Sequence, residues 1–424
     1  MPVLNSTHHN IKNLIKRALK IFKRYGLTEK KMQENLLLFL EILEHKNIVP
    51  TFPIPATVLN RKHALIKQLS QNGAAFAIHG KKHIDCTKIS PDRFNNHVRK
   101  AVQIFQHHKI PCTGFRFPYL KGNQIHLDQL KACSIQWDSS DAILWDVIPR
   151  YAFDDSHWDD YQNMLQHYNP KNSSHALSLP RFHNGLLEIP ISLPDDDLLE
   201  RLGIRDSDEA SGIWLKILRN THSRGELFTL QLHPERITLY KNVLEMTIQS
   251  LTELNPAVWI TTLSGIHDWW KLKSEFSVNL TSKNNYDYDI EVICDKQATF
   301  LVRSEDLPRE KFYKDYKIEN DRKFRLVSRK RPLIGISPGC SPRLTDFLAN
   351  EGFISEKSEN LDAYSIYLDN FSNFSEEDEF KVLREIDNNA SPLIRFWRWP
   401  NNHRSCFTIT GDIDSLTLVD FLVR

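Results

Sequence analysis

Short apolar runs alternate with longer amphipathic segments over roughly residues 10–275 of the 424-residue chain. Between the runs, segments such as Met32–His45 and Ser90–His107 repeat apolar residues every three or four positions, which predicts helices. Strands that alternate with helices indicate an α/β fold, either a parallel sheet or a (β/α) barrel, with a site at the strands' carboxyl ends. The apolar runs that we expect to form strands are Ile48–Ile54, Ala74–Ile78, Gly114–Phe117, Ser134–Trp137, Leu186–Ile191, Leu227–His233 and Ala257–Leu263.

The pattern changes after residue 275. Segments within 276–330 alternate apolar and polar residues with a period of two, which predicts a small β-rich subdomain. The last apolar run, Cys406–Ile409, is followed closely by two acidic residues, Asp412 and Asp414. We expect four parts: 1–275 as the main part of a barrel, 276–330 as the small β subdomain, 331–400 as an α/β segment, and 401–424 as a strand and helix that complete the barrel.

Composition and charge narrow the class of protein. Hydrophobic residues make up 41% and charged residues 25% of the chain, which is typical of a soluble globular protein. A net charge of +2 gives no reason to expect nucleic acid as a partner. The six cysteines are scattered without a Cys-x-x-Cys pair, so we expect buried thiols in a reducing compartment.

The N-terminal region favours a cytoplasmic protein. It has no signal-peptide pattern, and no uninterrupted apolar run approaches the length of a membrane span. The segment Ile11–Gly26 is basic and amphipathic, which suits either a packed surface helix or peripheral contact with an anionic membrane. Both interpretations stay open, and the sequence does not indicate an oligomeric state.

Two histidines directly follow a predicted buried strand, Ala74–Ile78. His79 and His83 are separated by three residues, so both imidazoles can lie on one side of a turn, as a single metal ion requires. The spacing alone is weak evidence, because it arises by chance among 18 histidines. Its position at the end of a strand is what favours a metal site.

Other predicted strands also end in polar residues. Arg116, Pro118 and Tyr119 follow one strand, and His233 follows another. The spacing Asp-x-Asp occurs at 195/197, 206/208, 287/289 and 412/414, and only the last pair follows an apolar run directly. We therefore expect the other three acidic pairs to lie in solvated faces or turns.

The order of these motifs resembles that of a known family. HGKKH at 79–83, RFPY at 116–119, WDSSD at 137–141 and LQLHP at 230–234 resemble the motifs of the polysaccharide deacetylases, carbohydrate esterase family 4, with the NodB-homology fold. The resemblance covers about residues 25–275. It implies a distorted (β/α) barrel and a metal-dependent hydrolase.

One motif of that family is missing from its usual place. The family begins with a strand that ends in an acidic pair, but residues 1–30 contain no aspartate. The pair that fits is Asp412 and Asp414, near the other end of the chain. The resemblance therefore implies a circular permutation, with the first strand of the barrel placed last.

The resemblance also implies a metal ion and two reacting groups. Asp414, His79 and His83 would bind one divalent ion, most simply Zn²⁺, with Co²⁺, Ni²⁺ and Mn²⁺ left open. Asp412 would act as general base, and His233 would act as general acid.

Further residues would support that reaction. Arg116 would hold Asp412 charged, the backbone N–H of Tyr119 would stabilise an oxyanion, and Asp138 or Asp141 would orient His233. A carbohydrate groove would be formed by Pro118, Tyr119 and Trp137. Trp137, together with Trp269 and Trp270, could equally be a core aromatic residue.

The implied reaction is hydrolysis of the N-acetyl group of an amino sugar, in a polysaccharide or in a nucleotide- or lipid-linked precursor. Two alternatives stay open for the activity: an amidohydrolase of the same superfamily that acts on a small linear or cyclic amide, and an inactive carbohydrate-binding relative. A further alternative concerns assembly, because the C-terminal strand could complete a neighbouring subunit's barrel in a swapped dimer.

Overall fold

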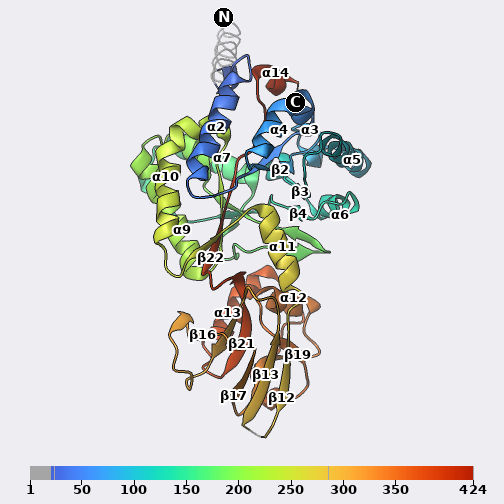
Figure 1. Ribbon diagram of the computed structural model, residues 1–424, viewed down its shortest axis with the longest axis vertical. Coiled ribbons are helices and arrows are strands. Elements are labelled where there is room, and N and C mark those ends of the chain that lie inside the picture. Colours follow the sequence, from blue (N-terminus) through green and yellow to red (C-terminus); the bar gives the residue numbers. More distant parts are fainter. Residues whose placement is uncertain (1–20, 23, 285, 424) are drawn as a thin grey trace, which may run out of the picture.

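The computed structural model describes residues 21–22, 24–284 and 286–423, and Figure 1 shows their arrangement. A main sheet surrounded by helices forms the upper part of the view, and smaller sheets with α12 and α13 form the lower part. The predicted α/β fold is confirmed. Most of the basic segment predicted at 11–26 lies outside the described residues. No helix in the described part of the chain has the length and apolar character needed to cross a membrane.

The main sheet takes its strands from both halves of the chain. Its order is β10-β22-β1-β2-β3-β4-β8-β7, and β11 pairs with β22 beside this path. All pairs are parallel except the hairpin of β7 and β8. The strands are β1 (Thr51–Ile54), β2 (Ala75–Ile78), β3 (Gly114–Phe115), β4 (Trp137–Asp138), β7 (Arg181–His183), β8 (Leu186–Glu188), β10 (Leu227–Gln231), β11 (Val258–Ile260) and β22 (Ser405–Thr410).

Helices cover the main sheet (Figure 1). Several begin at side chains that accept a hydrogen bond from a backbone N–H of the first turn, as Ser90 does for α5. The helices are α2 (Lys30–Glu44), α3 (Ala56–Arg61), α4 (His63–Gln71), α5 (Pro91–His107), α6 (Gln124–Ala132), α7 (Asp155–Tyr168), α8 (Asp196–Arg201), α9 (Ser207–Arg224), α10 (Ile237–Glu253), α11 (Leu263–Lys273) and α14 (Leu418–Leu422). A small parallel sheet is formed by β5 (Ala142–Leu144), β6 (Lys171–Asn172) and β9 (Ile191–Leu193).

The C-terminal strand β22 is a central strand of the main sheet. Five of its residues, Cys406 to Thr410, pair with Leu227 to Gln231 of β10, and Thr410 also pairs with Thr51 of β1. All six residues of β22 are buried. The last apolar run of the sequence is therefore part of the core, although the circular permutation inferred from the family stays a prediction.

Strands between residues 277 and 400 form two antiparallel sheets and one parallel sheet below the main sheet (Figure 1). β14, in the predicted small subdomain, pairs with β21, in the predicted α/β segment, so the two segments share a sheet. The division into four parts stays a prediction. The elements are β12 (Ser277–Ser282), β13 (Asp287–Ile293), β14 (Ala298–Arg303), β15 (Lys311–Tyr313), β16 (Tyr316–Glu319), β17 (Lys323–Val327), β18 (Arg331–Ile336), α12 (Pro342–Asn350), β19 (Ser355–Lys357), β20 (Tyr364–Leu368), α13 (Glu379–Asp387) and β21 (Leu393–Pro400).

Candidate active site

Three potential metal ligands meet at the carboxyl ends of β2 and β22. The Nε2 atom of His79 lies 3.6 Å from Oδ1 of Asp414, and the Nε2 atom of His83 lies 3.2 Å from the same oxygen. Two atoms that both bind one ion at about 2 Å lie about 4 Å apart or less. The donor set of two imidazole nitrogens and one carboxylate oxygen therefore fits a single divalent ion, and one ligand atom from each residue lies within 4.8 Å of the others.

The backbone of the RFPY turn orients His79. Its Nδ1 atom lies 2.8 Å from the carbonyl oxygen of Arg116, so Nδ1–H donates to that carbonyl. This tautomer leaves the lone pair of Nε2 on the side of Asp414, where a metal ligand needs it. The bond also couples the end of β2 to the end of β3.

A tight turn carries the chain from His79 to His83. Gly80 has a φ of +77°, and a Cβ atom built there would lie 2.8 Å from both Nε2 of His97 and the carbonyl oxygen of Lys82. The N–H of Lys81 donates to Nε2 of His97 at 2.8 Å. Burial lowers the pKa of His97 to about 4, so this imidazole is neutral and can accept that hydrogen bond.

Asp412 lies beside the potential metal ligands and is paired with a buried arginine. Its Oδ1 atom accepts from Nη1 of Arg116 at 2.8 Å, and its Oδ2 atom lies 3.8 Å from Nε2 of His79. The side chain of Arg116 is fully buried and also donates to Oγ1 of Thr410 and to the carbonyl of Ser139. The contact expected between Arg116 and Asp412 is present, and their catalytic roles stay predictions.

Asp414 is the more exposed carboxylate of the pair. Its side chain is 16% exposed, compared with 5% for Asp412. Burial by itself would raise the pKa of Asp414, but the imidazoles of His83 and His79 outweigh it and hold this pKa well below its usual range. The carboxylate is therefore ionised, as a metal ligand has to be.

His233 is oriented by Asp196, a carboxylate other than the two expected from the sequence. Its Nδ1–H donates to Oδ1 of Asp196 at 2.8 Å, and the other oxygen of Asp196 accepts from Nη1 of Arg236 at 3.0 Å. Asp196 is fully buried. Burial lowers the pKa of His233, but Asp196 outweighs this and raises it to about 10, so the imidazole is protonated at neutral pH.

The prediction that Asp138 or Asp141 orients His233 was wrong. Asp138 lies in β4, and His233 follows β10. Four strands of the main sheet, β22, β1, β2 and β3, lie between β10 and β4. Its Oδ1 atom accepts from Oγ of Ser140, and Asp141 pairs with Lys171 at 3.0 Å. Neither carboxylate bonds to His233, because sheet order rather than sequence order decides which strand ends are neighbours.

The WDSSD motif supports Arg116 instead. Oγ of Ser139 accepts from Nη2 of Arg116, and Oγ of Ser140 accepts from the N–H of Phe117, each at 2.8 Å. Ser140 in turn donates to Asp138, whose pKa is raised well above its usual range by burial. The motif therefore fixes the turn that carries the arginine.

The run Asp195–Asp197 also contradicts an expectation, because Asp195 and Asp196 are fully buried rather than solvated. A signal in the sequence could have identified them. They follow the apolar strand β9 with only Pro194 between, so they occupy the same strand-end position as Asp412. Pro194, between the apolar run and Asp195, makes this strand-end position harder to recognise in the sequence.

The remaining predicted groove residues divide into two groups. Tyr119 adopts a left-handed backbone conformation, with a φ of +61°, and its ring centroid lies 4.6 Å from that of His83. Pro118 is buried beside it. Trp137 is fully buried, and a Cβ atom on Gly114 would lie only 2.0 Å from its ring, so its predicted contact with sugar is wrong. Trp269 and Trp270 are also buried in the core.

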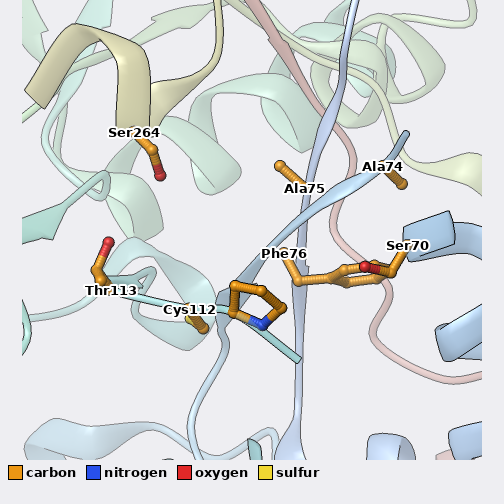
Figure 2. A pocket seen from close by; sticks show the side chains of 8 residues that line it. Ser70, Ala74, Ala75, Phe76, Cys112, Thr113 and Ser264 are labelled. Carbon is orange, nitrogen blue, oxygen red and sulfur yellow. The ribbon is translucent and has the colours of Figure 1, made fainter. Parts of the chain in front are cut away.

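A cavity of about 190 Å³ lies away from these residues, at the opposite end of the strands. Figure 2 shows Ala74, Ala75 and Phe76 at the start of β2, with Cys112 and Thr113 on the segment before β3. Burial raises the pKa of the Cys112 thiol to about 12, so it is not a ready nucleophile. The reactive groups therefore belong to the carboxyl edge of the sheet.

Comparisons with known proteins point to one family. Residues 12–137 match the family model described as polysaccharide deacetylase. No curated protein matches the chain.

Solved structures of similar proteins share low sequence identity with the chain. A protein from Mycobacterium smegmatis, described as a polysaccharide deacetylase, is 17% identical, with 55% of this chain and 76% of that chain covered and a TM-score of 0.42. The PuuE allantoinase is 15% identical, with 56% and 72% covered and a TM-score of 0.43. A family 4 carbohydrate esterase from Streptomyces lividans, in complex with acetate, is 16% identical, with 41% and 79% covered and a TM-score of 0.24.

Proposed function

We propose that the chain is a metal-dependent hydrolase that removes the N-acetyl group of an amino sugar and releases acetate, in keeping with the match of residues 12–137 to the polysaccharide deacetylase family model. One observation carries the proposal. His79, His83 and Asp414 lie within metal-binding distance of one another, beside the ion pair of Asp412 and Arg116. Such a site combines a metal position with a separate carboxylate that can accept a proton.

In this proposal, Asp414, His79 and His83 hold the ion. Zn²⁺ suits two imidazoles and a carboxylate best, and Co²⁺, Ni²⁺ and Mn²⁺ accept the same ligands. When bound, the ion would polarise the amide carbonyl as a Lewis acid and lower the pKa of a bound water molecule. The hydrogen bond from His79 to the carbonyl of Arg116 prepares Nε2 for this role.

The chain's own groups would move the protons. Asp412 would accept a proton from the attacking water, and Arg116 would hold that carboxylate in position through its hydrogen bond. The protonated imidazole of His233 would donate its Nε2 proton to the leaving amine nitrogen, while Asp196 holds the ring through Nδ1. The N–H of Tyr119 would donate a hydrogen bond to the developing oxyanion.

Removal of two ligands tests the proposal. The double variant His79→Ala/His83→Ala is expected to lose bound metal, measured by elemental analysis, and acetate release from N-acetylglucosamine derivatives. His45→Ala is a suitable control, because His45 is exposed at the end of α2 and distant in sequence from both histidines. A double variant that keeps full deacetylase activity would rule the proposal out.

A further inference from the structure

A strained turn connects the candidate metal site to a lysine and a histidine. Tyr119 and Leu120 have φ values of +61° and +58°, an unfavourable conformation for two successive residues with side chains. The ring of Tyr119 lies edge-on to His83 on one side, with centroids 4.6 Å apart, and to His167 of α7 on the other, with centroids 5.6 Å apart. His167 is therefore one tyrosine ring away from a proposed metal ligand.

Lys121 follows this turn and contacts the same histidine. Its Nζ atom lies 3.1 Å from Nδ1 of His167. An ammonium group can only donate, so Nδ1 accepts and the imidazole carries its proton on Nε2. Burial, and then the charge of Lys121, lower the pKa of His167, which agrees with a neutral ring. Lys121 and His167 therefore offer N–H donors from two adjacent side chains, both half-buried.

The charges around His167 leave an excess of positive charge. Within the described residues, no carboxylate lies within 4.0 Å of the Lys121 ammonium group. Asp85 lies near His167, but its Oδ1 atom accepts from Thr87 and its Oδ2 atom lies 3.7 Å from Lys88. Arg201, another nearby cation, is paired with Asp197. The charge of Lys121 reaches Asp85 at longer range and lowers the pKa of that carboxyl group, but this single carboxylate also faces Lys88, so positive charge remains in excess around His167.

We propose that Lys121 and His167 form a subsite for a phosphate group on the amino-sugar substrate. The inference rests on the proposed function and makes it more specific, because it favours a phosphorylated sugar, nucleotide- or lipid-linked, over a neutral polysaccharide. A phosphate matches the two donors with its acceptor oxygens and neutralises the lysine. The ring of Tyr119 sets the spacing between this group and the acetamide at the metal site.

Binding measurements test this subsite without relying on turnover. Calorimetry on the full-length, metal-loaded protein would compare N-acetylglucosamine, N-acetylglucosamine 1-phosphate and inorganic phosphate. Lys121→Gln is expected to weaken binding of the 1-phosphate about tenfold, the effect of losing one charge-assisted hydrogen bond, and to leave the neutral sugar unchanged. Lys121→Arg keeps the charge and is expected to retain most of the affinity for the 1-phosphate.

Lys131→Gln serves as a matched control. It removes one positive charge from an exposed position on α6, where the ammonium group bonds to the carbonyl of Asn184. This variant is expected to bind the neutral and the phosphorylated sugar as the wild type does. Equal affinity of Lys121→Gln and wild type for the 1-phosphate would overturn the inference, because a lysine that only tethers the turn to α7 would not distinguish the two sugars.

Two further substrates separate the sources of the phosphate. The affinities of wild type and Lys121→Gln are compared for a nucleoside-diphosphate amino sugar and for a short-chain prenyl-diphosphate amino sugar. A weaker affinity of Lys121→Gln for either ligand supports the subsite and identifies which kind of phosphate it binds. Acetate release is measured in parallel. Phosphate-dependent binding without acetate release from any sugar would contradict the proposed function and leave the subsite in place. Acetate release that does not change with phosphate on the sugar or with Lys121→Gln would support the proposed function and contradict the subsite.

Discussion

The group that accepts from each Nδ1 atom decides what the two main histidines can do. A neutral carbonyl, that of Arg116, accepts from His79, so its Nε2 atom is left as a potential metal ligand. A buried carboxylate, Asp196, accepts from His233 and keeps its imidazole positively charged. The same residue type is thus prepared for two different roles by partners that differ by one charge.

Removal of the charge of Asp196 should change the pH profile of the reaction. In Asp196→Asn the anion is lost while burial and Arg236 remain, and both of these lower the pKa of His233 from about 10. A general acid with a lower pKa loses its proton at lower pH, so the alkaline limb of kcat is expected to move to lower pH. At neutral pH, kcat is expected to fall roughly 10- to 100-fold.

A profile of kcat against pH measures this shift. Asp206→Asn is the control, because Asp206 only caps α9 at an exposed position. An alkaline limb that stays where the wild type has it would show that Asp196 does not set the pKa of His233.

The two aspartates of the C-terminal motif should separate in their effects. Asp414→Asn is expected to lose metal affinity, because Asp414 lies 3.2 Å from His83 and 3.6 Å from His79. Asp412→Asn is expected to keep the metal and to lose acetate release by roughly 10²- to 10⁴-fold, as removal of a general base does. Metal content and initial rates, measured on the same preparations, check both statements. Loss of metal in both variants would assign Asp412 to the metal instead.

At the scale of elements, parallel strands bring the site together. β22, β1, β2 and β3 are consecutive in the main sheet, so residues that follow their carboxyl ends meet at one edge. β10 adds His233 from the other side of β22. Short turns then fix each side chain, and the turn after β2 carries two of the proposed ligands, His79 and His83.

The turn at Gly80 offers a test of this arrangement. Gly80→Ala places a Cβ atom 2.8 Å from both the carbonyl of Lys82 and Nε2 of His97, at a φ of +77°. We expect a loss of stability of about 1–3 kcal/mol and a weaker metal affinity, because His79 and His83 have to move apart. Thermal unfolding and metal titration measure the two effects.

Gly73→Ala separates backbone strain from steric contact. Gly73 also has a positive φ, +92°, but a Cβ atom there meets nothing within 4 Å. This variant is expected to lower stability through its backbone conformation alone and to keep the metal affinity of the wild type. If Gly80→Ala also keeps that affinity, the turn does not position the ligands.

At the scale of the whole molecule, the C-terminal strand β22 is part of the core. β22 pairs with β10, β1 and β11, and Phe407 and Ile409 are fully buried. The N–H of Leu418, at the start of α14, donates to the carbonyl of Gly26, so the described C-terminal helix lies against the start of the described chain. Figure 1 shows α14 next to the blue N-terminal region. We propose that this arrangement reflects a circular permutation of the family's barrel.

Truncation after Ser405 should therefore remove both the fold and the site. The shortened chain loses a central strand and both aspartates, so we expect poor solubility, no cooperative unfolding and no metal binding. Truncation after Thr417 is the control, because it removes α14 but keeps β22, Asp412 and Asp414. A chain that ends at Ser405 and still binds metal would contradict the role of β22.

Much of the site could be predicted from the chain because strand ends are local features. An apolar run followed at once by His79, by Arg116 or by Asp412 is visible in the sequence, and parallel strands place such residues at one edge. The partner of His233 could not be predicted in this way. Asp196 follows β9, which is not in the main sheet, and its approach to His233 depends on how β9 packs beside β10.

The sequence by itself determined the α/β fold and the strand-end residues of the candidate site, because hydrophobic periodicity and strand-end residues depend only on near neighbours in the chain. Tertiary structure decided which carboxylate orients which histidine, because that depends on the order of strands in the sheet. In the folded chain, Asp138 and Ser140 hold the turn that carries Arg116, Trp137 is buried in the core, and Asp196 lies beside His233. Distances between residues far apart in the chain are set by packing, and a linear pattern does not contain them.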